Sequence, residues 1–568
     1  MPKPSQNGRK NTGDSNSLTF LYNRYLMRTR IWALVLFLTV LVFYLITLQP
    51  SLAWGDGIRL QREVITAESF ILAEIVDVNF APDPFPFARL GVAAWDHPLY
   101  VMLGHLLVRA LPMVHAPWLV NLLSALFGAG AITLLFLLCA RHTRSRPASL
   151  LAALTLAVSH TFWWHAVTPE VYTLFALLLL LAVYSFDTYE QYGRFTYLFI
   201  STLALGLGVA NHLLAGLSIL ALALYLLLAR KSWRDFPLKP RQILWLAVAF
   251  ILGSLPYWLQ FLRLLRTFNL PEVLGMAVGT TFLQGSTALS PALLSQSTVS
   301  YLIFLVYQFL LVGLLLGLYG WWTGRQPYPA LWNKAAALFV VYLLFGIFYR
   351  VSDQFAFFLG AHIFWAVAIA MGIAQLEQKV WPDRRWILSV VLALPLLIMP
   401  LFYDIAPDLL RTVGVTEESF GVPQIGSGVR DGLAYYLNPN KSGDVDAYAF
   451  GQQTLTSLPL DSLVLAQWYT DTDEYFVLRY FAVVDGKRPD IMLVGWPTEN
   501  PFTFDSQLAV QRVAAELPQR PVYLASLSEE FYAASTLITE YCILPEHNLY
   551  RVYPRAGEEE RPCISADN

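Results

Sequence analysis

Hydrophobic residues in this chain occur in blocks of up to about twenty, separated by short polar stretches that contain most of its Lys and Arg residues. An apolar block of this length can cross the roughly 30 Å hydrocarbon core of a bilayer as an α-helix. The pattern therefore predicts eleven transmembrane helices, at residues 31–48, 117–140, 148–164, 171–186, 196–211, 212–229, 243–262, 301–322, 335–349, 356–375 and 386–403.

One apolar segment, 98–111, is too short to span a bilayer and is interrupted by His105 and Arg109. We interpret it as an interfacial helix. If it crossed the membrane, the next span would place the arginines of loop 141–146 outside, against the excess of Lys and Arg found in cytoplasmic loops. With an interfacial helix, all the basic loops fall on the cytoplasmic side.

The composition supports a polytopic membrane protein, since 56% of the 568 residues are hydrophobic and only 14% are charged. The first span follows a polar tail and lacks a small-residue cleavage site, so we interpret it as a retained signal anchor. Residues 1–18 are expected to be disordered. A net charge of −2, with basic residues confined to loops, argues against a nucleic-acid partner.

Topology divides the chain into the tail 1–18, a membrane domain 19–403 and a hydrophilic domain 404–568. The basic residues before the first span place the N-terminus in the cytoplasm. The loop 49–116 is then exoplasmic, and an odd number of spans places the C-terminal domain on that same side. Acidic residues of the loop and groups of the domain could therefore act together.

The C-terminal domain alternates strand-like and helix-like segments, which indicates a small α/β domain. The expected strands are 462–466, 490–494 and 521–525, and the expected helices are 473–484, 505–517 and 529–538. Cys542 and Cys563 both lie in this domain. A disulfide between them and a pair of free thiols are both compatible with the sequence.

Acidic residues in two loops on the exoplasmic side are candidates for chemistry. Asp56 and Glu63 follow the first span, and His165 and Glu170 lie in the very short loop before the fourth. One carboxylate could remove a proton from a hydroxyl while another orients that hydroxyl or holds a divalent cation. The ordinary alternative is a solvated loop acid, and spacing alone does not separate Asp56 from the other acids of its loop, Glu68, Glu74, Asp77, Asp83 and Asp96.

Polar residues at the other turns on this side could bind a ligand or serve the fold. The segment Asp96-His97-Pro98-Leu99-Tyr100 enters the interfacial helix, where Asp or His could simply cap. His212 lies at a turn, and Arg350 precedes Asp353 in another, where an arginine could hold a lipid phosphate or merely extend to the membrane surface. The chain contains no P-loop, no G-x-G-x-x-G after a strand and no H-E-x-x-H motif.

Several short motifs, taken in order, resemble a known family. They are Gly55-Asp56, Glu63-Val64-Ile65-Thr66-Ala67, Leu90-Gly91-Val92-Ala93, His97-Pro98-Leu99-Tyr100, Asn121-Leu122-Leu123-Ser124, Glu170-Val171-Tyr172 and Gly206-Leu207-Gly208-Val209-Ala210-Asn211-His212. The chain is similar to glycosyltransferase family 117, whose eukaryotic relatives are protein O-mannosyltransferases. In that family the Asp and Glu are nearly adjacent, whereas residues 58–62 separate them here, and Asp96 could replace a displaced acid.

The resemblance implies a GT-C fold, a polyprenyl-phosphate sugar donor, a protein or glycan acceptor and transfer with inversion on the exoplasmic face of a bacterial plasma membrane. Asp56 would then be the catalytic base, with Glu63 and Glu170 orienting the acceptor or binding a metal. The expected substrate-binding residues are Asp96, His97, Tyr100, His165, Tyr172, His212 and Arg350. Two other hypotheses remain open, a flippase for lipid-linked sugars and an inactive envelope scaffold.

Overall fold

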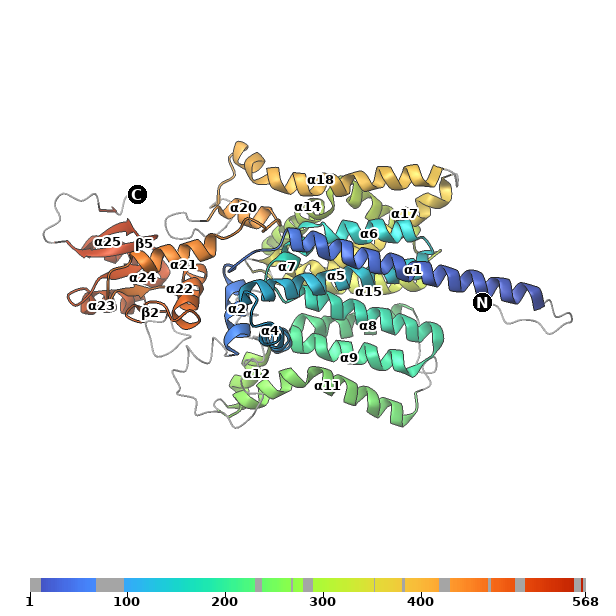
Figure 1. Ribbon diagram of the computed structural model, residues 1–568, viewed down its shortest axis with the longest axis horizontal. Helices are drawn as coiled ribbons and strands as arrows, with labels where there is room; N and C mark the ends of the chain where they lie inside the picture. Colours follow the sequence, from blue (N-terminus) through green and yellow to red (C-terminus); the bar gives the residue numbers. More distant parts are fainter. Residues whose placement is uncertain are drawn as a thin grey trace.

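The computed structural model describes residues 12–67, 97–229, 238–266, 269–278, 290–351, 353–380, 384–417, 430–467, 471–495, 506–555 and 563–564. A long helical bundle carries a smaller α/β domain at one end (Figure 1). The helices of the bundle are α1 (Thr12–Ile46), α2 (Asp56–Thr66), α4 (Pro98–Ala110), α5 (Ala116–Thr143), α6 (Arg146–Ala157), α7 (His160–Val167), α8 (Tyr172–Tyr192), α9 (Phe195–Asn211), η1 (Leu213–Ala215), α10 (Gly216–Leu228), α11 (Pro240–Leu264), α12 (Leu270–Val278), α14 (Pro291–Thr323), α15 (Pro329–Phe348), α16 (Gln354–Phe357), α17 (Leu359–Lys379) and α18 (Arg385–Thr412).

The chain is a multi-pass membrane protein. Among the described residues, 8 helices are long and apolar enough to cross a membrane, and the count is 9 if α6 and α7, bent by 65°, are taken as one span. Two of the eleven expected spans correspond to shorter apolar helices, Phe195–Asn211 and Leu213–Leu227. Each predicted span therefore coincides with a helix, or with the bent pair, and the long helices number fewer than predicted.

The first helix begins earlier than the sequence pattern suggested. It is already helical at Thr12, so residues 12–18 of the tail expected to be disordered belong to α1, while residues 1–11 lie outside the described part of the chain. At the other end of the membrane domain, α18 continues to Thr412. The expected domain boundary at 403/404 thus falls within a helix.

Packing of the bundle separates a buried centre from a lipid-facing rim. Helix α17 is central, since 89% of its most apolar 18-residue stretch is buried. Helix α18 is peripheral, since only 11% of the same kind of stretch is buried. The backbones of α14 and α17 approach closely at Gly320, where an added Cβ would lie 1.8 Å from the Ala368 carbonyl oxygen. Apolar side chains on the rim, such as Trp322 and Leu397, are exposed in the isolated chain. Such side chains are expected to contact lipid in a membrane.

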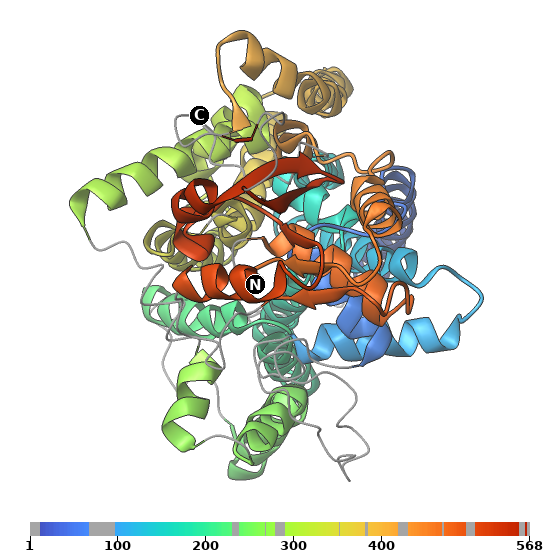
Figure 2. The same cartoon turned by 90° about the vertical axis from the view of Figure 1, so that its left-hand side faces the viewer.

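Helix α4 lies across the end of the bundle. It is seen along its axis in Figure 1 and lengthwise after the 90° turn of Figure 2, whereas the spans run along the bundle. This orientation is the one expected of a helix at the membrane surface. The short helix α2 packs against α4 at the same end.

The C-terminal domain is built on a five-stranded sheet in the order β2-β1-β3-β5-β4, with β2, β1 and β3 parallel and the last two strands antiparallel. The predicted strands and helices are confirmed, and the hairpin β4–β5 was not foreseen. A disulfide joins Cys542 to Cys563. The elements are α20 (Gly432–Leu437), α21 (Asp446–Ser457), β1 (Leu463–Leu465), α22 (Thr472–Val483), β2 (Met492–Val494), α23 (Ser506–Glu516), β3 (Val522–Leu524), α24 (Glu529–Tyr532), α25 (Ala534–Glu540), β4 (Tyr541–Glu546) and β5 (Leu549–Pro554).

The C-terminal domain shares a hydrophobic core with the membrane domain. Trp54 and Ile58 of the first loop and Trp164 of α7 cluster with Tyr435 and Phe450. Helix α2 also lies against α22. The two domains therefore enclose one end of the bundle, and the loop that carries Asp56 lies between them.

Candidate active site

A network of amide side chains fixes the loop between α1 and α2. Gln61 accepts a hydrogen bond from the backbone of Ala53 and donates to Asn121 at 2.9 Å. Asn121 donates in turn to the carbonyls of Gln49 and Ser51. Gln61 and Asn121 are fully buried, so the loop is held rigidly against α5.

Gly55 sets the start of α2. Its φ of 56° and ψ of −131° lie in a region that residues with a side chain rarely occupy. An added Cβ would also lie 3.3 Å from the Asp473 carboxylate of the C-terminal domain. Glycine therefore allows both the turn and the close approach of the second domain, and it places Asp56 in the first turn of α2, where the helix dipole favours a negative charge.

Asp56, Arg59 and Glu63 lie on one face of α2. The Arg59 guanidinium is 3.2 Å from an Asp56 oxygen and 3.5 Å from a Glu63 oxygen. The exposed fractions differ sharply, with 68% for the Asp56 side chain, 11% for Arg59 and 1% for Glu63. Asp56 therefore faces open space, and Glu63 lies beneath it against Arg59.

Glu170 and Asp353 place two more carboxylates near Asp56. Burial, followed by the charges of Asp56 and Asp353, raises the pKa of Glu170 well above its usual value, while Arg59 acts in the opposite direction. Burial and the charge of Asp56 raise the pKa of Asp353 to about 6. These mutual effects mean that acids from three separate loops share one space.

The backbone of Glu170 is held by hydroxyl groups beneath it. Ser124 Oγ donates to the Glu170 carbonyl and accepts from the Glu170 amide, both at 3.1 Å. Tyr100 in turn lies 2.9 Å from Ser124 Oγ and is completely buried. Of the expected substrate-binding residues, Tyr100 is thus the one whose hydroxyl is engaged in positioning Glu170.

Four of the expected residues form an aromatic row beside the acids. Its rings run from His97 to His212 (5.0 Å between centroids), Tyr172 (5.4 Å), His165 (4.7 Å) and Phe355 (5.5 Å). Burial, with a smaller contribution from Arg59, lowers the pKa of His97 to about 4. His97 is therefore uncharged near neutral pH, and its Nδ1 lies 2.8 Å from the Asn211 carbonyl.

For the two remaining expected residues, Arg350 and Asp96, the described part of the chain shows no contact with this group. Arg350 lies in the turn before Asp353 and makes no hydrogen bond or ion pair within the described residues. Asp96, like Glu68, Glu74, Asp77 and Asp83, falls outside the described residues. A divalent cation remained open from the sequence, and within the described ranges no three His, Cys, Asp or Glu side chains form a group that could hold one.

Three site residues were not singled out from the sequence. Arg59 lies in the segment 58–62 that interrupts the family spacing, yet its separations of three from Asp56 and four from Glu63 are the helical signal that could have identified it. Arg430 lies 3.1 Å from Asp473 and stacks over Tyr435, with 4.8 Å from its guanidinium carbon to the ring centroid. No local pattern marks this pair, because its partners lie 43 residues apart in the C-terminal domain and meet only in the folded chain.

The site thus combines one exposed carboxylate, two partly buried carboxylates of raised pKa, an arginine that pairs with the exposed one, and a row of aromatic rings. Such a set can accept a proton from a hydroxyl, orient further hydroxyls and stack against a sugar ring. Among the described residues, burial and the charge of Asp56 raise the pKa of both Glu170 and Asp353. This arrangement is costly for stability and typical of functional sites.

Comparison with solved structures defines the class of fold. The apo crystal structure of ArnT from Cupriavidus metallidurans aligns with a TM-score of 0.55 over 94% of this chain and 98% of ArnT, at 16% identity. The structure of the same protein bound to undecaprenyl phosphate aligns with the same score over 92% and 97%. The chain therefore has the expected GT-C fold, and its likeness to ArnT extends over nearly its whole length.

Sequence comparison adds relatives that share residues with this chain as well as its fold. Residues 94–235 match the family model of the protein O-mannosyl-transferase TMEM260 N-terminal domain. Protein O-mannosyl-transferase TMEM260 of Mus musculus is 28% identical over 230 residues, which cover 40% of this chain and 29% of the mouse protein. The match spans less than a third of that relative. The expected relation to O-mannosyltransferase-like GT-C proteins is confirmed.

Proposed function

We propose that this protein transfers a sugar from a polyprenyl-phosphate donor to a hydroxyl group of a protein or glycan acceptor. The observation that carries the proposal is the exposed Asp56 carboxylate, surrounded by Arg59, Glu170 and Asp353, in a GT-C fold. ArnT, which shares that fold, has been crystallised with undecaprenyl phosphate. The TMEM260 relative is named for O-mannosyl transfer, which also requires a hydroxyl acceptor.

In the proposed reaction Asp56 takes the proton from the acceptor hydroxyl as its oxygen bonds to the anomeric carbon. The bond between that carbon and the donor phosphate breaks, and polyprenyl phosphate leaves with the electron pair. Attack opposite the leaving group inverts the anomeric centre. The exposure of Asp56 lets an acceptor approach, and Arg59, 3.2 Å away, orients its carboxylate.

The neighbouring residues have separate proposed roles. Glu170 and Asp353 accept hydrogen bonds from hydroxyls of the sugar or acceptor, and Glu63 positions Arg59 from below. The uncharged His97 and the ring of Tyr172 contact the sugar, with His165 and His212 behind them. Arg350 holds the donor phosphate, whose charge grows as it leaves.

The proposed orientation places this site outside the plasma membrane of a bacterial cell, with the N-terminus in the cytoplasm. It is supported by the basic residues at the opposite end of the bundle, among them Arg141, Arg144, Arg194 and Arg385. Labelled cysteines in loop 49–67 and in loop 324–328 would test the orientation. Labelling of the second loop alone by an impermeant reagent on whole cells would contradict it.

Transfer can be tested on the full-length protein in detergent, with labelled polyprenyl-phosphate mannose and other polyprenyl-phosphate sugars as donors. Peptides rich in Ser and Thr and reducing-end glycans serve as acceptors. We expect labelled product together with free polyprenyl phosphate in equal amount. A flippase would give no product without a membrane to cross, and absence of both product and donor binding across the panel would contradict the proposal.

A further inference from the structure

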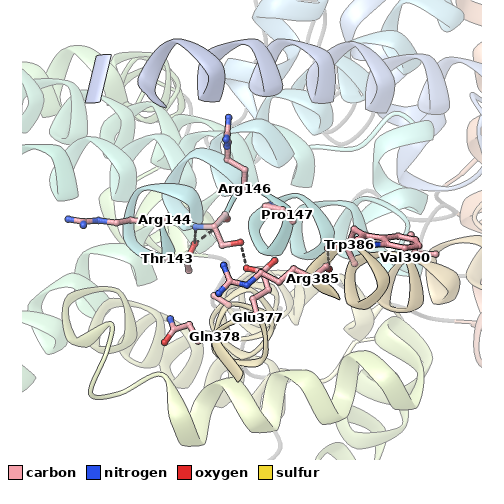
Figure 3. Close-up of a pocket in the computed structure, with 12 residues that line it drawn as sticks. Thr143, Arg144, Arg146, Pro147, Glu377, Gln378, Arg385, Trp386 and Val390 are labelled. Atoms are coloured by element: carbon pink, nitrogen blue, oxygen red, sulfur yellow. Dashed lines mark hydrogen bonds between the residues drawn. The ribbon is translucent and has the colours of Figure 1, made fainter. Parts of the chain in front are cut away.

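A cavity lies at the end of the bundle opposite the C-terminal domain (Figure 1), and Figure 3 shows the residues that line it. Its volume is about 660 Å³, far larger than a single ion requires. It is formed where the loop between α5 and α6 meets the C-terminal end of α17 and the N-terminal end of α18. The lining residues are Thr143, Arg144, Ser145, Arg146, Pro147, Ala374, Glu377, Gln378, Arg385, Trp386, Ser389 and Val390.

Glu377 is the unusual group in this cavity. Only 8% of it is exposed, and Ser145 Oγ donates to one of its oxygens at 2.5 Å. Within the described ranges no Lys, Arg or His nitrogen lies within 4.0 Å of its carboxylate. A carboxylate can accept about four hydrogen bonds, so a buried one with a single donor is poorly satisfied. The cavity leaves room for a cationic donor beside it.

Arginines supply positive charge around the same cavity. Arg385 extends toward Glu377 without forming an ion pair, and Arg144 and Arg146 point outward from the rim (Figure 3). A ligand that carried only a positive charge would meet these arginines unfavourably, and one that carried only a negative charge would meet Glu377. The two signs together suit a ligand with an ammonium group and a phosphate group a few bonds apart.

The outer wall of the cavity faces lipid. Trp386 and Val390 of α18 line the cavity and are 66% and 54% exposed, and α18 is the least buried of the long spans. An occupant with acyl chains could lay them along this helix while its head group entered the cavity. A small soluble phosphate compound has no acyl chains that could pack against that surface, so the surface would add nothing to its affinity.

We propose that this cavity binds the head group of a phospholipid that carries a primary amine, such as phosphatidylethanolamine. The ammonium group donates to Glu377, and the phosphate is held by Arg385 with Gln378 beside it. The acyl chains lie against Trp386 and Val390. The site is separate from the transfer site, and its occupancy does not depend on the proposed reaction.

The discriminating probe is a pair of lipids with identical acyl chains, phosphatidylethanolamine and phosphatidylcholine. Only the first has N–H groups that can donate to Glu377. Native mass spectrometry of the full-length protein with an equimolar mixture should show phosphatidylethanolamine retained at least about fivefold over phosphatidylcholine, as expected for one charge-assisted hydrogen bond. Equal retention of the two lipids would overturn the proposal.

Single substitutions test which residues cause the preference for phosphatidylethanolamine. Glu377→Gln keeps an acceptor for Ser145 and should bring the ratio of the two lipids close to one. Arg385→Gln should weaken retention of both lipids and of phosphatidylglycerol, which shares the phosphate. Arg194→Gln removes an exposed arginine from a loop outside the cavity and is the matched control, with unchanged ratios expected. An unchanged ratio in Glu377→Gln would overturn the assignment.

Two further outcomes are covered by the same design. If Glu377→Gln does not elute as a folded protein in size exclusion, Arg385→Gln decides alone, and unchanged retention in that variant counts against the proposal. Glycerophosphoethanolamine, the soluble head group, serves as the second probe. If it displaces the lipid at equal concentration, the site recognises a soluble compound, and the lipid assignment is wrong.

Discussion

Two groups of acids, one around Asp187 and one around Asp56, lie at opposite ends of the helix bundle and have different surroundings. Away from the C-terminal domain, Asp187 accepts from Lys334 at 2.5 Å, from His142 at 2.8 Å and from Arg141 at 3.0 Å. Lys334 also contacts Glu190 at 2.7 Å. At the other end, Asp56, Glu170 and Asp353 lie near one another, and the positive charge of Arg59 offsets part of their effect on Glu170.

The comparison separates acids that hold the fold from acids available for chemistry. Asp187 is only 4% exposed and fully paired, so breaking its network should cost stability. Asp56 is 68% exposed and contributes little to packing. Burial and the charge of Asp56 raise the pKa of both its neighbours, Glu170 and Asp353. Excess negative charge at that end is what a site for hydroxyl groups would need.

The sharpest way to test the comparison is Asp56→Asn. We expect transfer to fall by roughly 10²- to 10⁴-fold, the usual worth of a general base, with an unchanged thermal unfolding temperature. Asp408→Asn is a matched control because Asp408 is also exposed and pairs with an arginine three residues later, at 3.0 Å. Transfer assays in detergent that show equal rates for both variants would contradict the role of Asp56.

At the opposite end, Lys334→Met should act on stability rather than on transfer. It leaves Asp187 and Glu190 buried with fewer positive partners, and we expect a loss of about 3 kcal/mol. The measurement is unfolding in detergent, with transfer rates normalised to folded protein. Lys487→Met removes an exposed partner of Asp485 and should change stability by less than about 0.5 kcal/mol. Equal effects of the two variants on stability would contradict the structural role of the Asp187 network.

A smaller effect is expected from Gly55→Ala. The backbone conformation of Gly55 costs a residue with a Cβ about 1–3 kcal/mol, and the added methyl would approach Asp473. Displacement of Asp56 should lower the transfer rate about tenfold. Gly193→Ala is the control, since Gly193 also has a positive φ of 67° but has nothing within 4 Å of an added Cβ. Similar rates for both variants would show that the position of Asp56 does not depend on this turn.

The smallest effect concerns Asp353→Asn and pH. Because the folded pKa of Asp353 is raised to about 6, the folded protein holds this proton more tightly than the unfolded chain does. The resulting stability is present at low pH and is lost as the pH rises through about 6. Asparagine removes that loss, so the variant should be about 1–2 kcal/mol more stable than the wild type at pH 8 and similar to it at pH 4. A gain that does not change with pH would contradict this origin.

Much of the architecture follows from patterns along the chain. The apolar blocks predicted the helices, and alternating segments predicted the strands β1, β2 and β3. Fewer than eleven long helices are found among the described residues, because α9 and α10 are short and α6 with α7 is bent. Whether a short apolar helix crosses a membrane depends on its neighbours, and composition alone does not contain that information.

The candidate site was only partly predictable. Asp56 and Glu170 could be assigned to one side of the membrane by counting spans, and the resemblance marked Asp56. Asp353 was seen as a polar residue in a turn, but its proximity to Asp56 depends on how α15 and α17 pack. Arg59 was not identified, because residues 58–62 were interpreted as an insertion between Asp56 and Glu63 rather than as part of a helix that places all three on one face.

The sequence by itself determined that this protein is embedded in a membrane, which loops share a side, and where its α/β domain begins to alternate strand and helix. These properties depend on local hydrophobicity and charge, which act over one helix or strand at a time. Only the tertiary structure decided which acids are paired and which are left to face one another. Pairing depends on distances of a few ångströms between residues far apart in the chain, such as Lys334 and Asp187 at 2.5 Å.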